Sequence, residues 1–275
     1  MKTRTISEPT KLLWLSDLHL DLSSDEFKSR FFGKLKALPY DCVVITGDIS
    51  NGRQLASHLD ELAEVCAPRP VYFCLGNHDF YESTFAAVNH EVELACRRHG
   101  NLNFLGNGEI LPIGRDTAIV GHGGWADGRA GWGKRTIIES RDHHSIGDFK
   151  NLSKDEVFDR MEMLGQESAR YFRRVLPYAL SCYSEVIIAT HVPPFQSVTL
   201  QHHGKECGRT HLPHYSNSCA AGPVLAIVRK YPGRRATLLC GHTHHSARKT
   251  FDNLTVCVAG AQRGRPAIQG VLEVK

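Results

Sequence analysis

Short, continuous apolar runs recur along the chain and are separated by longer segments of mixed polarity. The runs are Leu12–Leu15, Cys42–Thr46, Val71–Leu75, Ala118–Val120, Val186–Ala189, Thr237–Cys240 and Leu254–Val258. Because they are uninterrupted rather than alternating, they predict strands that are buried on both faces, as in a parallel sheet. A further run, Gly270–Val274, is expected to form an edge strand.

Helical patterns occupy several of the segments between these runs. The expected helices are Glu26–Leu38, Gln54–Val65, Thr84–Arg98, Lys154–Leu176 and Pro223–Lys230. The fourth has a clear start, because Ser153 is followed three residues later by Glu156, as in a capping box. Alternating strands and helices predict a layered α/β fold with a largely parallel sheet. Without a linker-like stretch, we expect a single domain over residues 1–275.

Two segments interrupt this rhythm, near residues 121–150 and 196–219. The first contains the glycine-rich stretch Gly121–Gly133, and the second contains Gln196–Asn217, which is polar and rich in histidine. Long irregular segments in a compact domain are usually functional or disordered. We expect both to border a cleft, and plain surface loops are the alternative.

Charge and composition narrow the possible partners. The chain has 33 basic and 29 acidic residues, and a net charge of +4 does not suggest a nucleic-acid partner. No apolar run approaches the roughly 20 residues that span a bilayer, and the N-terminus lacks a signal-peptide core. The nine cysteines are scattered, several within strand-like runs. They are expected to be free thiols in a reducing compartment, so we expect a cytoplasmic protein without a membrane partner.

Metal-competent side chains follow five of the expected strands. They are Asp17, His19, Asp48, Asn77, His191, His242 and His244. Ligands of open α/β sheets bind at the carboxyl ends of the strands, so these side chains should converge. Carboxylate, imidazole and amide donors suit Mn, Fe or Zn. Seven ligands are too many for one ion but fit two ions, roughly 3.5–4 Å apart, that share a carboxylate.

In order, the motifs D-x-H, G-D, G-N-H-D, a later H and G-H-x-H resemble the signature of the calcineurin-like metallophosphoesterases. The resemblance extends from Asp17 to His244 and implies a central β-sandwich flanked by helices. It implies that Asp48 bridges two metal ions and that His78 serves the leaving oxygen of the substrate. The implied ligands of the first metal are Asp17, His19, Asp48 and His244, and those of the second are Asp48, Asn77, His191 and His242.

The implied activity is hydrolysis of phosphomonoesters or phosphodiesters by a metal-bridging hydroxide. Protein phosphatases of this family continue the G-D motif with V-D-R-G, whereas this chain has Asn51 in place of the carboxylate. The arginine is missing from its usual position, and Arg53 lies one residue further on. We therefore expect small substrates, with nucleotides among them, rather than phosphoproteins. The alternatives are a nuclease and a non-catalytic scaffold, although every ligand position is filled.

Weaker signals concern the substrate. His122, Trp125 and Arg129 follow a strand in the glycine-rich segment and could line the cleft, with Trp125 stacking on a base. From the second irregular segment, His202, His203 or His211 is expected to reach the cleft. A separate zinc site at Cys207, His211, His214 and Cys219 is the less favoured interpretation, because its spacing matches no common zinc finger. The substrate and the oligomeric state stay open.

Overall fold

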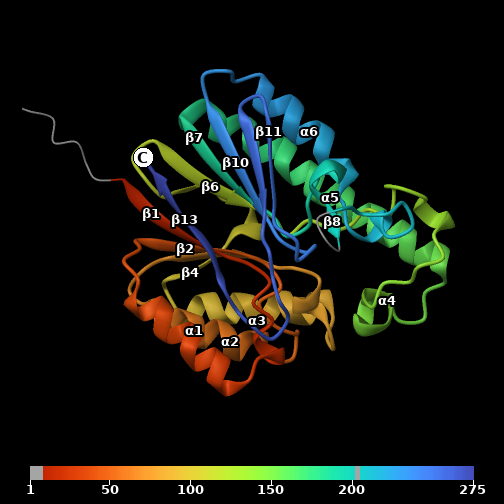
Figure 1. The fold of residues 1–275 in the computed structure, drawn as a ribbon, viewed down its shortest axis with the longest axis horizontal. Helices are drawn as coiled ribbons and strands as arrows, with labels where there is room; N and C mark the ends of the chain where they lie inside the picture. The colour runs from red at the N-terminus through yellow and green to blue at the C-terminus, as the bar shows by residue number, and fades with distance from the viewer. Residues whose placement is uncertain (1–8, 202–204) are drawn as a thin grey trace, which may run out of the picture.

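The computed structural model describes residues 9–201 and 205–275, which form two stacked sheets with helices outside them (Figure 1). The first sheet has the strand order β13-β1-β2-β3-β4. Its strands are β1 (Thr10–Leu15), β2 (Cys42–Thr46), β3 (Val71–Cys74), β4 (Leu102–Phe104) and β13 (Ile268–Val274). Strands β1 to β4 are parallel, and β13 pairs with β1 in the antiparallel direction.

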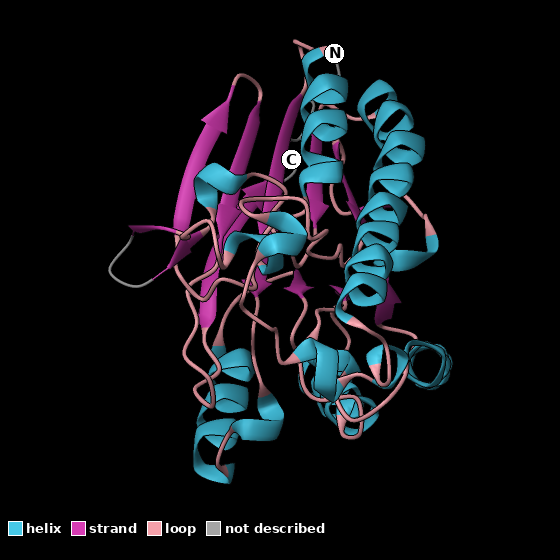
Figure 2. Ribbon diagram, turned by 90° about the vertical axis from the view of Figure 1, so that its right-hand side faces the viewer, coloured by secondary structure: helices cyan, strands magenta, loops and turns pink. Residues whose placement is uncertain are grey.

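The second sheet has the strand order β11-β12-β10-β7-β6-β5. Its strands are β5 (Leu111–Pro112), β6 (Thr117–Gly121), β7 (Glu185–Ala189), β10 (Arg235–Cys240), β11 (Ala247–Phe251) and β12 (Leu254–Val258). The four central strands are parallel, and the edge strands β5 and β11 are antiparallel to their neighbours. A separate hairpin of β8 (Leu200–Gln201) and β9 (Lys205–Glu206) projects from the body (Figure 2).

Helices cover the outer faces of both sheets. The first sheet is covered by α1 (Asp25–Ala37), α2 (Leu55–Cys66) and α3 (Phe85–Arg98), and the second by α5 (Lys154–Cys182) and α6 (Ser218–Arg229) (Figure 1). A short helix, α4 (Asp142–Ser145), lies in the irregular segment before α5. Between the sheets lies a shared apolar layer that includes Trp14, Val44 and Ile187. This arrangement confirms the expected α/β fold with a β-sandwich flanked by helices.

Some boundaries differ from the sequence prediction for local reasons. Helix α6 begins at Ser218 rather than at Pro223, because the Asn217 side chain accepts a hydrogen bond from the Ala220 amide and caps an earlier turn. Helix α5 has the expected capping box but continues through Pro177 to Cys182. The sequence does not predict strands β4, β5 and β11, since two are very short and β11 has no continuous apolar run.

The carboxyl ends of the parallel strands in both sheets lie along one edge of the sandwich. Strand β12 belongs to the second sheet, and the next strand along the chain, β13, belongs to the first. Ile268 at the start of β13 pairs with Leu15 at the end of β1, so segment 259–267, between β12 and β13, crosses the same edge.

Within the described residues, no helix has the length and apolar character needed to cross a membrane.

Candidate metal centre

Turns after β1, β2 and β10 bring together a first group of candidate ligands. One ligand atom from each of Asp17, His19, Asp48 and His244 lies within 4.8 Å of the others. The His19 Nε2 atom is 3.1 Å from His244 Nε2, and His244 Nε2 is 3.3 Å from Asp17 Oδ1. Two carboxylates and two imidazoles facing one point form a donor set that suits Mn, Fe or Zn.

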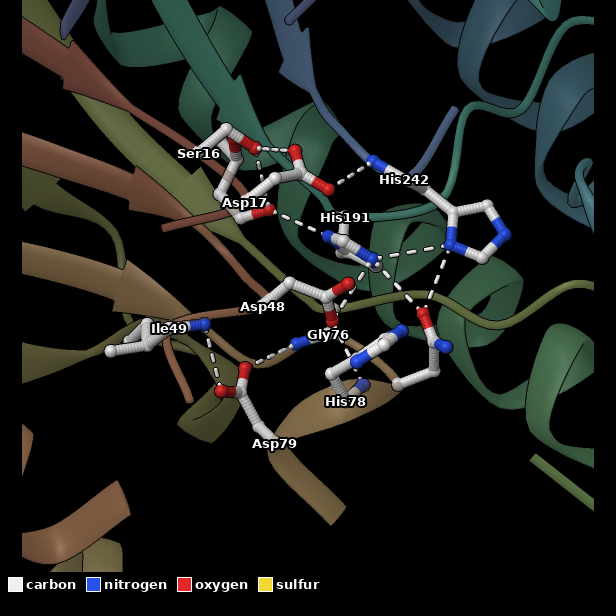
Figure 3. A network of polar contacts seen from close by, with 12 residues as sticks. Ser16, Asp17, Asp48, Ile49, Gly76, His78, Asp79, His191 and His242 are labelled. Carbon is white, nitrogen blue, oxygen red and sulfur yellow. Dashed lines mark hydrogen bonds and ion pairs between the residues drawn. The ribbon is translucent and has the colours of Figure 1, made fainter. Parts of the chain in front are cut away.

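A second group of candidate ligands lies on the other side of Asp48. The Asp48 Oδ1 atom is 3.3 Å from His191 Nε2 (Figure 3). The Asp48 Oδ2 atom is 3.8 Å from His19 Nε2. The Asn77 Oδ1 atom is 3.1 Å from His191 Nε2 and 2.9 Å from His242 Nδ1. Each oxygen of Asp48 therefore faces one of the two groups, as a bridging ligand requires.

Two histidines of this second group have their tautomers set by backbone carbonyls. The Nδ1 atom of His191 is 2.9 Å from the Thr46 oxygen, and Nε2 of His242 is 2.8 Å from the His214 oxygen. An N–H at each of these positions donates to the carbonyl, and the other ring nitrogen keeps its lone pair for a metal. The residues present therefore fit a bound metal ion.

The backbone at the ligands adopts an unusual conformation. Among the ligands of both groups, five non-glycine residues have positive φ angles: Asp17 (49°), His19 (43°), Asp48 (52°), His242 (72°) and His244 (59°). A residue held in this left-handed region costs on the order of 1–3 kcal/mol and persists where the surroundings fix it. Such residues concentrate at functional sites, so backbone strain marks the same positions as the sequence motifs do.

Glycines next to the ligands allow the turns to approach closely. A Cβ atom on Gly76 would overlap Asp48 Oδ1 and lie 2.8 Å from His191 Cδ2. A Cβ atom on Gly241 would overlap the carboxylate of Asp17 in the same way. These positions therefore require glycine because a carboxylate occupies the space of a side chain.

Burial and mutual charge determine the protonation of the ligands. Burial lowers the pKa of His19 and of His242 to about 4, although Asp48 acts in the opposite direction on both. Burial also disfavours the charged form of His191, but the adjacent Asp48 carboxylate raises its pKa to about 10. Burial would raise the pKa of Asp48, and the neighbouring histidines hold it well below the usual value. His191 is therefore expected to be protonated in the metal-free protein, and a bound cation would take the place of that proton.

Asp79 connects the turn after β2 to the turn after β3 by hydrogen bonds. It is fully buried and accepts hydrogen bonds from the amides of Ile49 (2.8 Å), Ser50 (2.9 Å) and Gly76 (2.8 Å) (Figure 3). Burial and the nearby Asp48 charge raise the pKa of Asp79 to about 8, against the effect of those amides. It faces the backbone and supports the turns that present Asp48 and Asn77.

A cavity of about 200 Å³ opens over both groups of ligands. Its wall includes Asp48, Asn77, His78, His242 and His244, together with residues of segments 138–142 and 211–215. The His78 amide donates to Asp48 Oδ1 at 2.9 Å, and its ring stacks on Tyr81 with the centroids 4.1 Å apart. The His78 side chain therefore borders the space beside the ligands.

The sequence model for calcineurin-like phosphoesterases matches residues 10–246. The chain belongs to this family. Comparison with curated proteins found no match. Membership makes the chain a phosphoric ester hydrolase of a family that depends on a dinuclear metal centre.

Solved structures share the fold of this phosphoesterase at low sequence identity. Phosphopantetheinyl hydrolase from Mycobacterium tuberculosis is 14% identical, with a TM-score of 0.60 over 94% of this chain and 92% of that one. TT1561 of Thermus thermophilus is 13% identical, with a TM-score of 0.50 over 92% and 89%. A putative 5'-nucleotidase from Staphylococcus aureus is 13% identical, with a TM-score of 0.50 over 96% of this chain and 54% of that one.

Several residues at the site of this phosphoesterase were not singled out from the sequence. Asp142 of α4 accepts hydrogen bonds from Asn77 Nδ2 at 2.8 Å and from the Tyr81 hydroxyl at 2.6 Å. These bonds orient the Asn77 amide so that its oxygen faces His191 and His242. Arg141 and Arg263 also line the cavity. None of them belongs to a motif, and only the irregularity of segment 121–150 pointed to Asp142 and Arg141.

The three substrate residues suggested by the sequence lie elsewhere in the phosphoesterase. Trp125 is only 5% exposed and packs against Phe80, Phe85 and Phe149. It borders a different cavity, of about 490 Å³, together with His122. The Arg129 guanidinium is 3.7 Å from the Glu162 carboxylate on α5. The structure therefore does not meet the expectation that His122, Trp125 and Arg129 line the metal cleft, because the glycine-rich segment folds inward onto aromatic residues.

The histidine-rich segment is only partly described. His202 and His203 lie outside the described residues. His211 does border the cavity over the ligands, as expected for one member of this segment. Cys207 packs with Ala130 and Leu212, while the thiol of Cys219 lies 3.5 Å from the Arg129 guanidinium. These two cysteines have different neighbours, which does not favour a shared zinc site.

Proposed function

We propose that this protein hydrolyses small phosphomonoesters or phosphodiesters, with nucleotides among the candidate substrates. The observation that carries the proposal is the cavity of about 200 Å³ over two ligand groups that share Asp48. Such a space accepts a phosphoryl group and a small organic body. When bound, two metal ions would activate water for attack on phosphorus and neutralise charge on the phosphoryl oxygens.

The protein side chains divide into two ligand sets. We assign Asp17, His19 and His244 to the first metal and Asn77, His191 and His242 to the second, with Asp48 common to both. This assignment is supported by the positions of the two groups, which lie on either side of the Asp48 carboxylate. Mn, Fe and Zn are the ions that suit these donors best.

His78 is the proposed proton donor to the leaving group. In the reaction, the bond between phosphorus and the ester oxygen breaks as a water oxygen bonds to phosphorus. The ester oxygen then takes a proton, and the His78 imidazole borders the cavity at a position that could supply it. General acid catalysis of this kind contributes about 10²- to 10⁴-fold.

A folded phosphoprotein does not suit this site. Residues of segments 138–142 and 211–215 form part of the wall of the cavity, whose volume is about 200 Å³. Asn51 occupies the position of the carboxylate in the protein-phosphatase motif, and the Arg53 side chain is 78% exposed beside Glu82. Both observations favour small substrates.

We further propose that residues 1–275 act as one domain in the cytoplasm. The proposed ligand sets draw on strand ends of both sheets, so neither sheet alone could hold the metals. All nine cysteines are free thiols, which fits a reducing compartment.

A substrate panel tests the proposed function. Purified protein is loaded with Mn, Fe, Zn or Mg and assayed on p-nitrophenyl phosphate, bis(p-nitrophenyl) phosphate, nucleoside monophosphates, a folded phosphoprotein and single- and double-stranded DNA and RNA. We expect turnover of small esters that depends on the added metal. Faster cleavage of nucleic acid, with steep loss of activity in salt, would instead identify a nuclease. Phosphoprotein turnover that rivals the best small ester would overturn the choice of substrate class.

A further inference from the structure

We propose that Arg263 binds the phosphoryl oxygens of the substrate, a role that rests on the proposed function. The topology explains how a residue so near the end of the chain reaches the ligands. Segment 259–267 leaves β12 in the second sheet and enters β13 in the first. It must therefore pass over the edge at which the ligand-bearing strands end, and Arg263 lies within this crossing.

The backbone of segment 259–267 is hydrogen-bonded to the end of β10 and to the turn that follows it. The Ala261 amide donates to the carbonyl of His244 at 3.1 Å, and the Ala259 amide donates to that of Cys240 at 2.8 Å. The Arg265 amide closes a turn onto the Gln262 carbonyl at 3.0 Å. Gly264 has a φ angle of +73°, and a Cβ atom there would lie 2.8 Å from the Leu22 oxygen. Arg263 therefore projects from a turn that is fixed next to a proposed metal ligand.

The guanidinium of Arg263 reaches the cavity beside His78. Its Nη2 atom lies 3.3 Å from His78 Nε2, and both side chains border the cavity over the ligands. The His78 ring lies 4.6 Å from that of His19, measured between centroids. A phosphoryl group placed over the ligands and next to His78 would therefore be within reach of Arg263.

The charge of Arg263 is available to an anion. Among residues 9–201 and 205–275, no carboxylate forms an ion pair with it. In contrast, Arg53, the arginine nearest to the G-D motif on its C-terminal side, lies 3.9 Å from Glu82. A guanidinium offers a planar fork of donors that matches two phosphoryl oxygens. Arg141 also lines the cavity, with its guanidinium 5.5 Å over the Tyr81 ring, whereas Arg263 lies next to His78. Arg263 is thus the cation beside the proposed proton donor.

The test compares three variants of the metal-loaded protein. Arg263→Gln removes the charge, Arg263→Lys keeps a point charge without the fork, and Arg265→Gln is the matched control. Arg265 belongs to the same segment, but its guanidinium lies 5.2 Å over the Phe27 ring. Binding of inorganic phosphate is measured by calorimetry, together with metal content, KM and kcat on a nitrophenyl ester.

We expect Arg263→Gln to weaken phosphate binding by about 10- to 100-fold, as for loss of a charge-assisted hydrogen bond, with unchanged metal content. Arg263→Lys should recover part of this loss, and Arg265→Gln should bind as the unmodified protein does. Unchanged phosphate affinity in Arg263→Gln, with hydrolysis intact, would overturn the role of Arg263 and leave the proposed function standing. Loss of metal in that variant would also overturn it, because Arg263 would then support the ligands. If the unmodified protein hydrolyses no ester while Arg263→Gln still loses phosphate affinity, the proposed function fails and the anion site stands.

Discussion

The Asp48 carboxylate is the side chain that both proposed ligand groups share. Its two oxygens face His191 and His19, and its own backbone is held at a φ angle of 52°. We expect Asp48→Asn to lose most of its bound metal and nearly all hydrolysis, because an amide offers a single neutral oxygen in place of a bridging charge. Metal analysis and kcat measure this. Asp60→Asn, which changes a carboxylate paired with Arg98 at the surface, is the control. Two metals and normal turnover in Asp48→Asn would contradict the ligand assignment.

His78 should behave differently from the ligands. We expect His78→Ala to keep its metal and to lose about 10²- to 10⁴-fold in kcat, since a proton donor is removed. The loss should be smaller for a nitrophenyl ester than for an alkyl ester, because nitrophenolate leaves without a proton. Metal content and kcat on both esters test this. Equal losses on the two substrates would argue against proton donation, and loss of metal would make His78 a ligand or a support.

The residues that the sequence could identify share one property. Asp17, Asp48 and His191 each follow a buried strand after one intervening residue, so a rule about strand ends places them without knowledge of the packing. Arg263 follows no such rule, because its position depends on the crossing from β12 to β13. Trp125 lay in a glycine-rich segment that suggested exposure, but aromatic residues from α3 and the loop before α5 surround it. Long-range packing of this kind leaves no local pattern.

Among the elements, the turns after the strands place the proposed ligands, and a glycine in one of these turns can be compared with a glycine in a helix. We expect Gly76→Ala to reduce metal binding, because its Cβ would overlap Asp48 Oδ1. We expect Gly33→Ala in α1 to leave metal binding unchanged and to raise the free energy of unfolding by about 0.5–1 kcal/mol, since no atom lies within 4 Å of its Cβ and alanine favours a helix. Metal content and urea unfolding measure both effects. Equal metal content in the two variants would show that Gly76 is not needed for close approach.

The elements that the sequence predicted well are those with a strong local signal. Strand β2 (Cys42–Thr46) agrees in both bounds because its apolar run is continuous and fully buried. Helix α5 agrees at its start because Ser153 and Glu156 form the capping box. Strand β11 (Ala247–Phe251) is an edge strand whose middle residues are exposed, so it lacks an apolar run. The four-residue helix α4 is too short to have a period.

For the molecule as a whole, buried histidines should make the metal-free protein sensitive to acid. Burial lowers the pKa to about 4 in each of five histidines: His19, His58, His122, His143 and His242. The unfolded chain takes up protons near pH 6.5, whereas the folded protein resists them until about pH 4. The free energy of unfolding should therefore fall as the pH drops from about 6.5 to 4.

His191 has the opposite effect at higher pH. Its pKa is raised to about 10 by Asp48, so its stabilising contribution is complete below about pH 6.5 and is lost as the pH rises through 10. Urea midpoints of the metal-free protein from pH 4.5 to 10 test both effects. His122→Gln, which changes a histidine outside the ligand groups, should reduce the loss on the acid side alone. A midpoint that stays constant between pH 7 and pH 5 would contradict the first effect.

Because β1 pairs with β13, the first sheet cannot be completed until the end of the described chain has been synthesised. Thr10 pairs with Val274, so β1 is made long before the strand that covers its outer edge. At about 5–20 residues per second, the delay is on the order of 15 to 50 s. During this time β1 presents an unpaired edge, which is a hazard for aggregation. His244 is also made late, so the growing chain cannot complete its proposed first metal site until nearly all of the described residues have been synthesised.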